Sequence, residues 1–445
     1  MADGRKRVII IGGGFGGLNA AKKLGHVPVS VMLLDAKNHH TFQPLLYQVA
    51  TAGLSPGEIA PPIRWVLRRN RNTEVLLAEV TVFDVGRRVV KCGNQEFPYD
   101  YLIVAAGARH AYFGHDEWEP YAPGLKTIED ALEMRRRVLL AFETAERQAI
   151  TSGEHEMLNF VVVGGGPTGV ELAGTLSEIA RKALVRDFRA IDPKRTRIML
   201  IEGGPRVLPT YPEDLSSSAQ KQLEHLGVEV HTSEMVTGIE PMTVITKREK
   251  IRASVILWAA GVATSPLGRA LGAPTDRAGR VLVEPDLSLP GHPEVFVIGD
   301  LAALKDKNGN LLPGVAPVAI QQGKAVAKTI ARDLRGEARK EFHYFDKGNL
   351  ATIGRSAAVA RIGKLHISGV IAWLTWLFVH ITYLIGFRNR LLVLIQWAWS
   401  YFTYDRGARL ITGVTGLPDW ESQTKNEAEL AVVPKERPDE KSQAS

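Results

Sequence analysis

The sequence predicts an α/β protein in which one strand–turn–helix unit is inserted into another, followed by an apolar C-terminal region. A glycine-rich turn follows an apolar strand at Gly12–Gly17, and a second turn of the same kind follows one at Gly164–Gly169. Apolar strands with small or acidic ends return later, at Val255–Ala260 and Glu294–Ile298, so the second unit interrupts the first. The segment Ile367–Phe387 is almost wholly apolar.

The composition is typical of a globular protein with a sizeable core. The chain has 445 residues, of which 45% are hydrophobic and 23% charged, which suggests about three domain-sized units. A net charge of +7 is compatible with nucleic acid, an anionic membrane or anionic cofactors. The sequence carries no nucleic-acid-binding motif, so we expect no nucleic acid partner. No signal peptide precedes the strand Val8–Ile11, and we expect the chain in the cytoplasm or on that face of a membrane.

Cys92 is the only cysteine of the chain. A single thiol can form neither an intramolecular disulfide nor a dithiol redox pair, which excludes the disulfide reductases. It also argues against flavoproteins that oxidise sulfide through paired cysteines. His39, His40, His110 and His115 show no metal-ligand spacing, so we predict no metal site.

The first unit reads as strand Val8–Ile11, helix Leu18–Leu24 and strand Val29–Leu34. Glycines in the turn after such a strand let main-chain N–H groups approach a dinucleotide pyrophosphate, and the helix presents its positive N-terminal end. The turn fits the pattern G-x-G-x-x-G, which is informative in this strand–turn–helix context. The contact residues predicted here are Gly12, Gly14, Phe15, Gly16 and Gly17.

The second unit repeats this order after a helix predicted over Ile128–Ile150 and a polar hinge. It contains strand Phe160–Val163, a helix predicted over Glu171–Ile191 and strand Arg197–Ile201. Its turn fits the same pattern, so both units are Rossmann-like dinucleotide-binding domains. The contact residues predicted here are Gly164, Gly166, Pro167, Thr168 and Gly169.

Each unit has an acidic residue at the end of its second strand, Asp35 in the first and Glu202 in the second. Such a carboxylate can accept hydrogen bonds from an adenosine ribose and repels a 2′-phosphate. Glu202 therefore favours NADH over NADPH, although Arg197 and Arg206 weaken this inference. Two complete units predict a flavoprotein that also binds a nicotinamide cofactor.

The apolar C-terminal region has two parts, Ile367–Phe387 and the shorter Leu391–Phe402, separated by the cationic break Arg388–Arg390. Three alternatives remain open: two helices lying in a membrane interface, a spanning or re-entrant helix, and a buried core or dimer helix. We favour the first because aromatic residues and cations, which suit the headgroup layer, flank the region. These cations are Arg361, Lys364, Arg388, Arg390, Arg406 and Arg409.

Several segments together resemble one family. The segments His40–Ala50, Gly166–Glu171, Ala316–Gly323 and Lys347–Gly354, with the apolar C-terminal region, are similar to type II NADH dehydrogenase. This non-pumping NADH:quinone oxidoreductase belongs to the flavoproteins with two dinucleotide-binding domains. The resemblance implies a glutathione-reductase-like fold, with residues 1–125 and 289–340 binding FAD and 126–288 binding NADH. Residues 341–421 would anchor the chain to the membrane, and we expect 422–445 to be a disordered tail.

The resemblance also implies roles for individual residues. FAD would occupy the first turn and NADH the second, with Gly261 on the nicotinamide side and Asp300 at the ribityl chain. Gln321 would lie on the quinone side of the flavin, and Glu171 and Lys347 would take part in proton handling. Further cofactor contacts would come from Thr41, Pro44, Tyr47, Ala106, Gly107, Ala260, Gly299 and Gln322.

Each proposed catalytic residue has a structural alternative. Glu171 could be a carboxylate stabilised by a helix dipole, Gln321 could bond the start of its own helix, and Lys347 could be a solvated loop lysine. Pro317 departs from the family, whose quinone-site pattern has a glutamine at this position. The expected function is a membrane-associated, homodimeric NADH:quinone oxidoreductase acting on menaquinone or ubiquinone. Two alternatives remain: reduction of a soluble acceptor, and a slow-turnover redox sensor.

Overall fold

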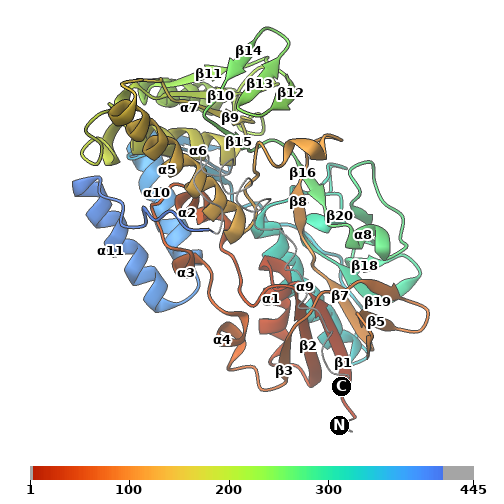
Figure 1. Cartoon of the computed structure of the whole chain (residues 1–445). Coiled ribbons are helices and arrows are strands. Elements are labelled where there is room, and N and C mark those ends of the chain that lie inside the picture. Colours follow the sequence, from red (N-terminus) through yellow and green to blue (C-terminus); the bar gives the residue numbers. More distant parts are fainter. Residues whose placement is uncertain (1–3, 414–445) are drawn as a thin grey trace, which may run out of the picture.

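Two sheets organise the chain, and each carries one glycine-rich turn (Figure 1). The structure is a computed structural model and describes residues 4–413. The first sheet has the order β18-β19-β7-β1-β2-β3, and the second has the order β11-β10-β9-β15. All neighbours in both sheets are parallel except β18 and β19. The strands are β1 (Lys6–Ile11), β2 (Val29–Asp35), β3 (Thr73–Leu77), β7 (Tyr101–Val104), β9 (Asn159–Val163), β10 (Arg197–Ile201), β11 (Val228–His231), β15 (Val255–Trp258), β18 (Ser288–Leu289) and β19 (His292–Val297).

The first sheet is buried on both faces, as the continuous apolar run of β1 predicts. Val8 and Ile10 pack in one cluster with residues of helices α1 (Phe15–Leu24) and α9 (Ala316–Asp333). Ile9 and Ile11 point to the opposite face, toward the antiparallel sheet of β4 (Val82–Asp84), β5 (Val89–Cys92) and β6 (Gln95–Pro98). The first turn therefore follows a strand whose two faces are both packed in the core.

The second sheet is built in the same way. On β9, Phe160 and Val162 pack with residues of α5 (Ile128–Thr151) and α6 (Pro167–Glu178). Val161 and Val163 face the other side, where the antiparallel strands β12 (Val236–Glu240), β13 (Thr243–Thr246) and β14 (Lys250–Arg252) cover them. Helix α7 (Glu213–His225) connects β10 to β11.

The insertion predicted from the sequence is confirmed by the strand order. Strands β7 and β19 are neighbours in the first sheet although the whole second sheet lies between them in the chain. The two crossings pair with each other as β8 (Ala108–His110) and β16 (Val262–Thr264). Strand β17 (Val281–Leu282) pairs with β20 (Ala302–Ala303), which follows β19 of the first sheet. The chain is therefore already back beside the first unit before residue 289.

The long helix expected over Glu171–Ile191 is shorter in the structure. Helix α6 ends at Glu178, a wider helical turn, η3, covers Ile179–Ala183, and the rest is irregular. The carboxylate of Glu146 on α5 accepts hydrogen bonds from the backbone N–H groups of residues 189–191. These bonds satisfy backbone N–H groups that a continued helix would have used, so the irregular segment is stable although the sequence pattern predicted one helix.

The C-terminal region combines a small sheet with two helices. The sheet consists of β21 (Asn349–Gly354), β22 (Ala357–Ile362) and β23 (Leu365–Ser368), and α10 (Gly369–Tyr383) and α11 (Phe387–Thr403) follow. The apolar run Ile367–Phe387 is thus divided between a strand, a helix and a turn. The predicted break at Arg388–Arg390 is wrong: the turn is formed by residues 384–386, with Gly386 at φ 95°, and the arginines begin α11.

A 15-residue helix such as α10 is about 22 Å long, against about 30 Å for a bilayer core. In the described part of the chain, no helix has both the length and the apolar character needed to cross a membrane. The predicted tail 422–445 lies outside the described residues.

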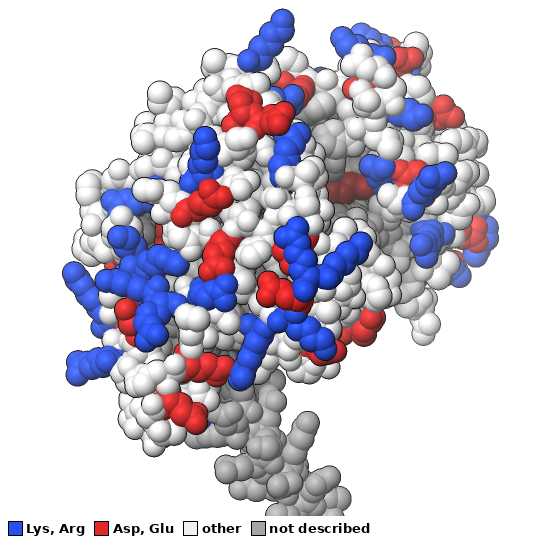
Figure 2. Space-filling view, turned by 90° about the horizontal axis from the view of Figure 1, so that it is seen from above, with Lys and Arg blue, Asp and Glu red and all other residues white. Residues whose placement is uncertain are grey.

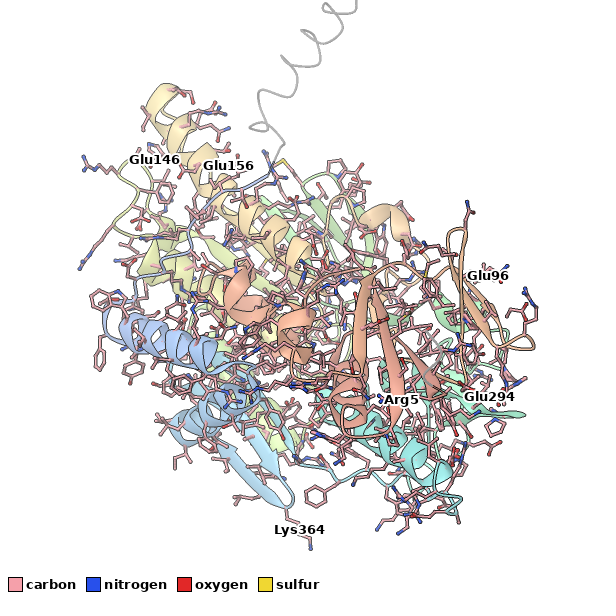
Figure 3. The ribbon with its side chains drawn as sticks, turned by 90° about the horizontal axis from the view of Figure 1, so that it is seen from below. Arg5, Glu96, Glu146, Glu156, Glu294 and Lys364 are labelled. Carbon is pink, nitrogen blue, oxygen red and sulfur yellow. The ribbon has the colours of Figure 1, made fainter. Side chains whose placement is uncertain are left out.

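The six cations that flank the apolar region do not form one headgroup-facing set, contrary to the prediction. Arg406 is buried against Glu178, Arg361 pairs with Asp346, and Arg409 pairs with Asp187. Arg390 donates to the carbonyl oxygens of residues 382 and 384 and so caps the end of α10. Lys364 stands at the outer tip of the hairpin β22–β23 (Figure 3). Arg388 is exposed on the first turn of α11.

Candidate active site

The first glycine turn leads from β1 into α1 without a side-chain cap on the helix. Gly14 occupies the N-cap position and provides no side-chain acceptor, so the first N–H groups of α1 remain available. A Cβ at Gly12 would lie 2.4 Å from the carbonyl oxygen of Ala105, and one at Gly17 would lie 1.9 Å from that of Gly12. A Cβ at Gly14 would meet nothing within 4 Å. The turn is thus packed tightly beneath and open above, as a pyrophosphate site requires.

Asp35 stands beside this turn at the end of β2. Its Oδ2 accepts a hydrogen bond from the N–H of Gly13 at 2.5 Å, and its Oδ1 accepts one from the N–H of Lys37 at 2.7 Å. Burial raises the pKa of the Asp35 carboxyl. The remaining lone pairs of this acid lie where a ribose bound on the turn could donate to them.

The second turn repeats this construction. Gly166 is the N-cap of α6, again without a side-chain acceptor, and Pro167 and Thr168 form the first helical positions. A Cβ at Gly169 would lie 1.8 Å from the carbonyl oxygen of Gly164. Glu202 accepts hydrogen bonds from the N–H groups of Gly165 at 2.5 Å and Gly204 at 2.6 Å. The two units therefore place corresponding backbone donors and an acidic residue around two separate sites.

Replacing Glu202 with glutamine is expected to lower the preference for NADH over NADPH by about tenfold. The reason is the loss of a carboxylate that repels a 2′-phosphate, an effect of about 1–4 kcal/mol at roughly 4 Å near a protein surface. The measurement is the ratio of kcat/KM for the two nucleotides. Glu240→Gln, an exposed carboxyl on β12, is the matched control. Unchanged selectivity in the Glu202 variant would remove this role.

Further cofactor contacts predicted from the resemblance come from three segments of the chain. Ala106 and Gly107 precede β8, and Ala260 and Gly261 precede β16, so the pairing of β8 with β16 brings these loops together. A Cβ at Gly261 would lie 2.4 Å from Cζ of Phe113. Thr41 and Pro44 lie just before and within the short helix η1 (Gln43–Leu45), and Tyr47 lies in α2 (Leu46–Ala50).

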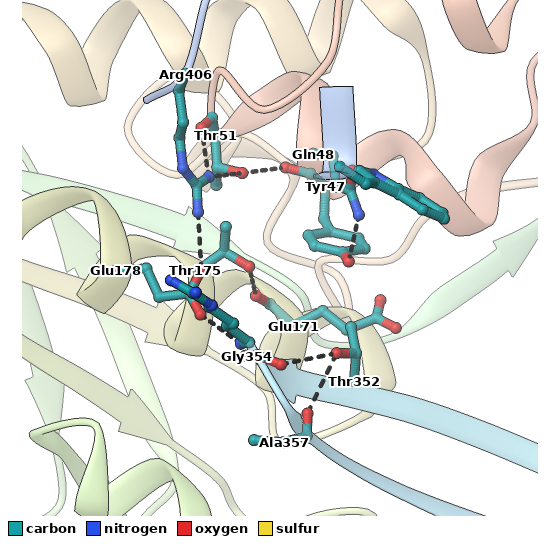
Figure 4. Close-up of polar contacts among 12 residues, drawn as sticks. Tyr47, Gln48, Thr51, Glu171, Thr175, Glu178, Thr352, Gly354, Ala357 and Arg406 are labelled. Atoms are coloured by element: carbon teal, nitrogen blue, oxygen red, sulfur yellow. Dashed lines mark hydrogen bonds and ion pairs between the residues drawn. The ribbon is translucent and has the colours of Figure 1, made fainter. Parts of the chain in front are cut away.

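Glu171 lies in the second turn of α6, where burial raises its pKa well above the usual range. The backbone N–H of Thr352 on β21 bonds its carboxyl group and opposes this shift. Two buried phenols, Tyr47 and Tyr211, face the same carboxyl, and its charge raises their pKa values further. Figure 4 shows Glu171 on α6, with Thr352 of β21 and the segment that carries Tyr47 around it. A carboxyl that retains its proton to an unusually high pH can act as a proton donor.

The structure places Gln321 and Lys347 at the junction between α9 and the C-terminal region. Gln321 bonds both backbone groups of Phe345, donating to the carbonyl oxygen at 3.0 Å and accepting from the N–H at 3.1 Å. Its polar atoms therefore do not bond the start of its own helix. Lys347 is exposed in the loop before β21 and donates to the hydroxyl of Tyr383 on α10 at 2.6 Å.

Gln322 on α9 contacts the short helix η5 (Gly299–Leu301), which follows β19 and carries Asp300. The buried Gln322 side chain accepts a hydrogen bond from the N–H of Gly299 at 2.6 Å and so fixes the backbone that presents Asp300. Lys126 faces Asp300, and burial lowers the pKa of this amine. Pro317 is the second residue of α9, in the first turn where a helix does not use the N–H group that proline lacks.

Sequence reasoning missed a polar network between α11 and the Tyr47 segment. Arg406 follows α11 and donates to the carbonyl oxygen of Thr51 and to Glu178, both at 2.9 Å (Figure 4). Gln48 donates to the hydroxyl of Tyr47 at 2.8 Å and accepts from the indole N–H of Trp397 at 2.7 Å. No local pattern marks these residues, because each partner is more than 200 positions away in the chain, except Tyr47, which adjoins Gln48.

His40 was given no role of its own from the sequence, although the segment His40–Ala50 carried part of the resemblance. It is buried beneath the first turn, its Nδ1 lies 3.0 Å from the carbonyl oxygen of Gly13, and its ring meets that of Phe15 edge-on at 4.9 Å. Burial lowers the pKa of His40 to about 4, so the ring is neutral at physiological pH.

Comparisons with known proteins point to one group. Residues 6–323 match a family described as pyridine nucleotide-disulphide oxidoreductase, and residues 347–404 match one described as NDH2 C-terminal domain. The chain is 47% identical over 424 residues to type II NADH:quinone oxidoreductase Ndh of Mycobacterium tuberculosis, covering 92% of this chain and 90% of that protein.

More distant proteins share the same architecture. The demethylphylloquinone reductase NdbB of Synechocystis is 29% identical, with 89% of this chain and 96% of that protein covered. The solved structure of NDH2 from Plasmodium falciparum in complex with NADH is similar with a TM-score of 0.82 at 22% identity, covering 92% of this chain and all of that chain.

Proposed function

The chain belongs to the type II NADH:quinone oxidoreductases, and on that premise we propose how its own residues divide the work between FAD, NADH and quinone. It is an FAD-dependent enzyme that oxidises NADH and reduces a quinone. The two uncapped helix starts, each beside its own acid, carry the assignment of residues to the two cofactors. We assign the first turn and Asp35 to FAD, and the second turn and Glu202 to NADH.

The residues around both turns fit such groups. At each site the glycines leave no room for a Cβ beneath the turn, while Gly14 and Gly166 face open space. The bound flavin supplies the hydride and electron chemistry. The chain holds the reacting groups in place: Gln322 fixes Gly299, Lys126 and Asp300 provide opposite charges beside the first turn, and the β8–β16 pair keeps the two sites in register.

We assign proton delivery to Glu171. Quinone reduction takes up two protons, and a carboxyl whose raised pKa keeps it protonated can supply one and be recharged. The adjacent phenols of Tyr47 and Tyr211 stay protonated, because burial raises the pKa of both hydroxyl groups. Gln321 and Lys347 would then hold the segment 345–347 beside the flavin, through their bonds to Phe345 and Tyr383.

We further propose that α10 and α11 lie on a membrane surface at the cytoplasmic face. Both helices expose large apolar side chains, which would dissolve in the interfacial layer and let a lipid-soluble quinone approach. These include Ile371, Leu374, Phe378, Phe387, Ile395, Trp399 and Phe402. A homodimer completes the proposal. It rests on the family resemblance alone, and light scattering of the purified protein tests it.

The function is tested by steady-state oxidation of NADH by the FAD-loaded protein. We expect rapid turnover with menaquinone or ubiquinone in lipid vesicles and slower turnover with water-soluble acceptors. Turnover confined to soluble acceptors would contradict quinone reduction at this site, and negligible turnover with tight nucleotide binding would indicate a sensor.

A further inference from the structure

Helix α4 (Ile63–Leu67) and the residues after it carry an unpaired cluster of positive charge outside the C-terminal region. Arg64, Arg68, Arg69 and Arg71, here called the basic strip, are all exposed. Among the residues that the structure describes, none of the four forms an ion pair, although Arg68 donates to the carbonyl oxygen of Trp65 at 2.8 Å. Charges of one sign without partners repel each other, so such a cluster is typical of a surface that meets anions.

Several other surface cations of this protein lie beside a carboxylate. Arg361 and Arg409 each have a carboxylate at 2.8 Å, from Asp346 and Asp187. In the view from above, over the second sheet, some blue basic side chains lie beside red acidic ones, and others gather on one side with few red ones among them (Figure 2). The basic strip differs from these paired cations, because four arginines within eight positions form no ion pair with a described residue.

The basic strip is continuous with the apolar face of α10 and α11. Trp65 is 43% exposed, and its ring lies against Gly386 in the turn between the two helices, 3.1 Å from where a Cβ would stand. Phe387 follows this turn and is 81% exposed, and Arg388 is exposed next to it. The guanidinium of Arg68 lies 4.4 Å from the centre of the Trp65 ring, so this tryptophan joins the apolar face to the cations. In Figure 1, α4 lies near the lower end of α11.

We propose that the basic strip binds the phosphate headgroups of anionic lipids, while Trp65 enters the interface beside α10 and α11. This proposal rests on the membrane docking of α10 and α11 proposed above, and it adds a second element, from the FAD-binding unit, with its own lipid preference. Arginine forms paired hydrogen bonds with phosphate oxygens, and tryptophan beside cations is typical of the headgroup layer. Arg69 and Arg71 also line a shallow hollow together with Arg5. Arg5 is labelled in the view from below (Figure 3).

The test is cosedimentation of the full, FAD-loaded chain with vesicles of two compositions, phosphatidylcholine alone and phosphatidylcholine with one-third phosphatidylglycerol. The wild-type protein is expected to bind the anionic vesicles more tightly, and added salt should reduce this difference. Changing the basic strip to glutamine (R64Q/R68Q/R69Q/R71Q) should lower the ratio of affinities for anionic and neutral vesicles at least tenfold. The reason is that each arginine at an anionic surface raises the affinity about fivefold. Binding to phosphatidylcholine alone should be unchanged.

The matched control, K247Q/K250Q/R269Q/R277Q, removes the same number of exposed charges, unpaired among the described residues, from β14, α8 (Leu267–Ala270) and their loops, away from α4. It should keep the preference for anionic vesicles. Equal losses in the two variants would overturn the proposal in favour of a net-charge effect, as would an unchanged preference in the strip variant. Inorganic phosphate at matched ionic strength should not displace the protein. Displacement would indicate a site for free phosphate instead. Binding of wild type to neither vesicle type would contradict the docking of α10 and α11 itself.

Discussion

Replacing Arg406 with methionine is expected to lower the free energy of unfolding by about 3–5 kcal/mol, because it leaves Glu178 buried without its cationic partner. The side chains of Arg406 and Glu178 are only 9% and 15% exposed, so water cannot replace the lost ion pair. The carbonyl oxygen of Thr51 also loses its donor. The measurement is urea unfolding of the FAD-saturated protein.

Two further variants show that the effect belongs to this ion pair. In R406M/E178Q, the uncharged amide can still accept from the N–H of Arg355, as Glu178 does at 2.5 Å, and much of the stability should return. Arg409→Met breaks contacts with Asp187 and Asp405 at the surface and should cost less than about 1 kcal/mol. A small loss in the Arg406 variant, equal to that of the Arg409 variant, would mean that the ion pair is solvated in the native protein.

Glu171→Gln is expected to lower quinone-dependent turnover by about a hundredfold to ten-thousandfold, the usual range for losing a positioned proton donor. Reduction of a one-electron acceptor that takes up no proton, such as ferricyanide, should change little in the same variant. In the wild-type enzyme, the quinone rate should fall as the pH rises through the raised pKa of Glu171, because only the protonated carboxyl can donate. The variant should lack this alkaline limb.

The measurement is the pH profile of both activities at saturating NADH. A purely structural role for Glu171, as a carboxylate near a helix start, predicts a different result. Both activities would then fall together, the pH profile would keep its shape, and the thermal midpoint would drop.

The two strand–turn–helix units could be predicted from the sequence. A buried strand, a glycine turn and a helix are contiguous, and the acid follows within one more strand, so Gly12–Gly17 with Asp35 and Gly164–Gly169 with Glu202 were recognisable in full. The insertion followed from the same pattern, because an apolar strand near residue 294, after the second unit, was interpreted as belonging to the first unit. The order β7-β19 confirms it.

The polar network around Glu171 could not be predicted in this way. Its members come from α2, α6, β21 and the residue Arg406, and only the tertiary fold brings them together. Arg406 was interpreted as an interfacial cation because a single arginine beside an apolar run carries no sign of its partner. The helix predicted over Glu171–Ile191 was too long for a related reason: the side chain of Glu146, far away in the chain, caps the irregular segment.

The contacts between α11 and the Tyr47 segment have a practical consequence for any truncated protein. Trp397 bonds Gln48, Gln396 bonds Glu58, and Arg406, which follows α11, bonds Thr51, so α11 and its end also hold the segment that carries Tyr47. Cutting the chain before α11 would therefore not yield a smaller soluble enzyme. It would expose the amide, carboxyl and backbone groups that α11 now covers. The resulting loss of activity would then be mistaken for an effect of lost membrane binding.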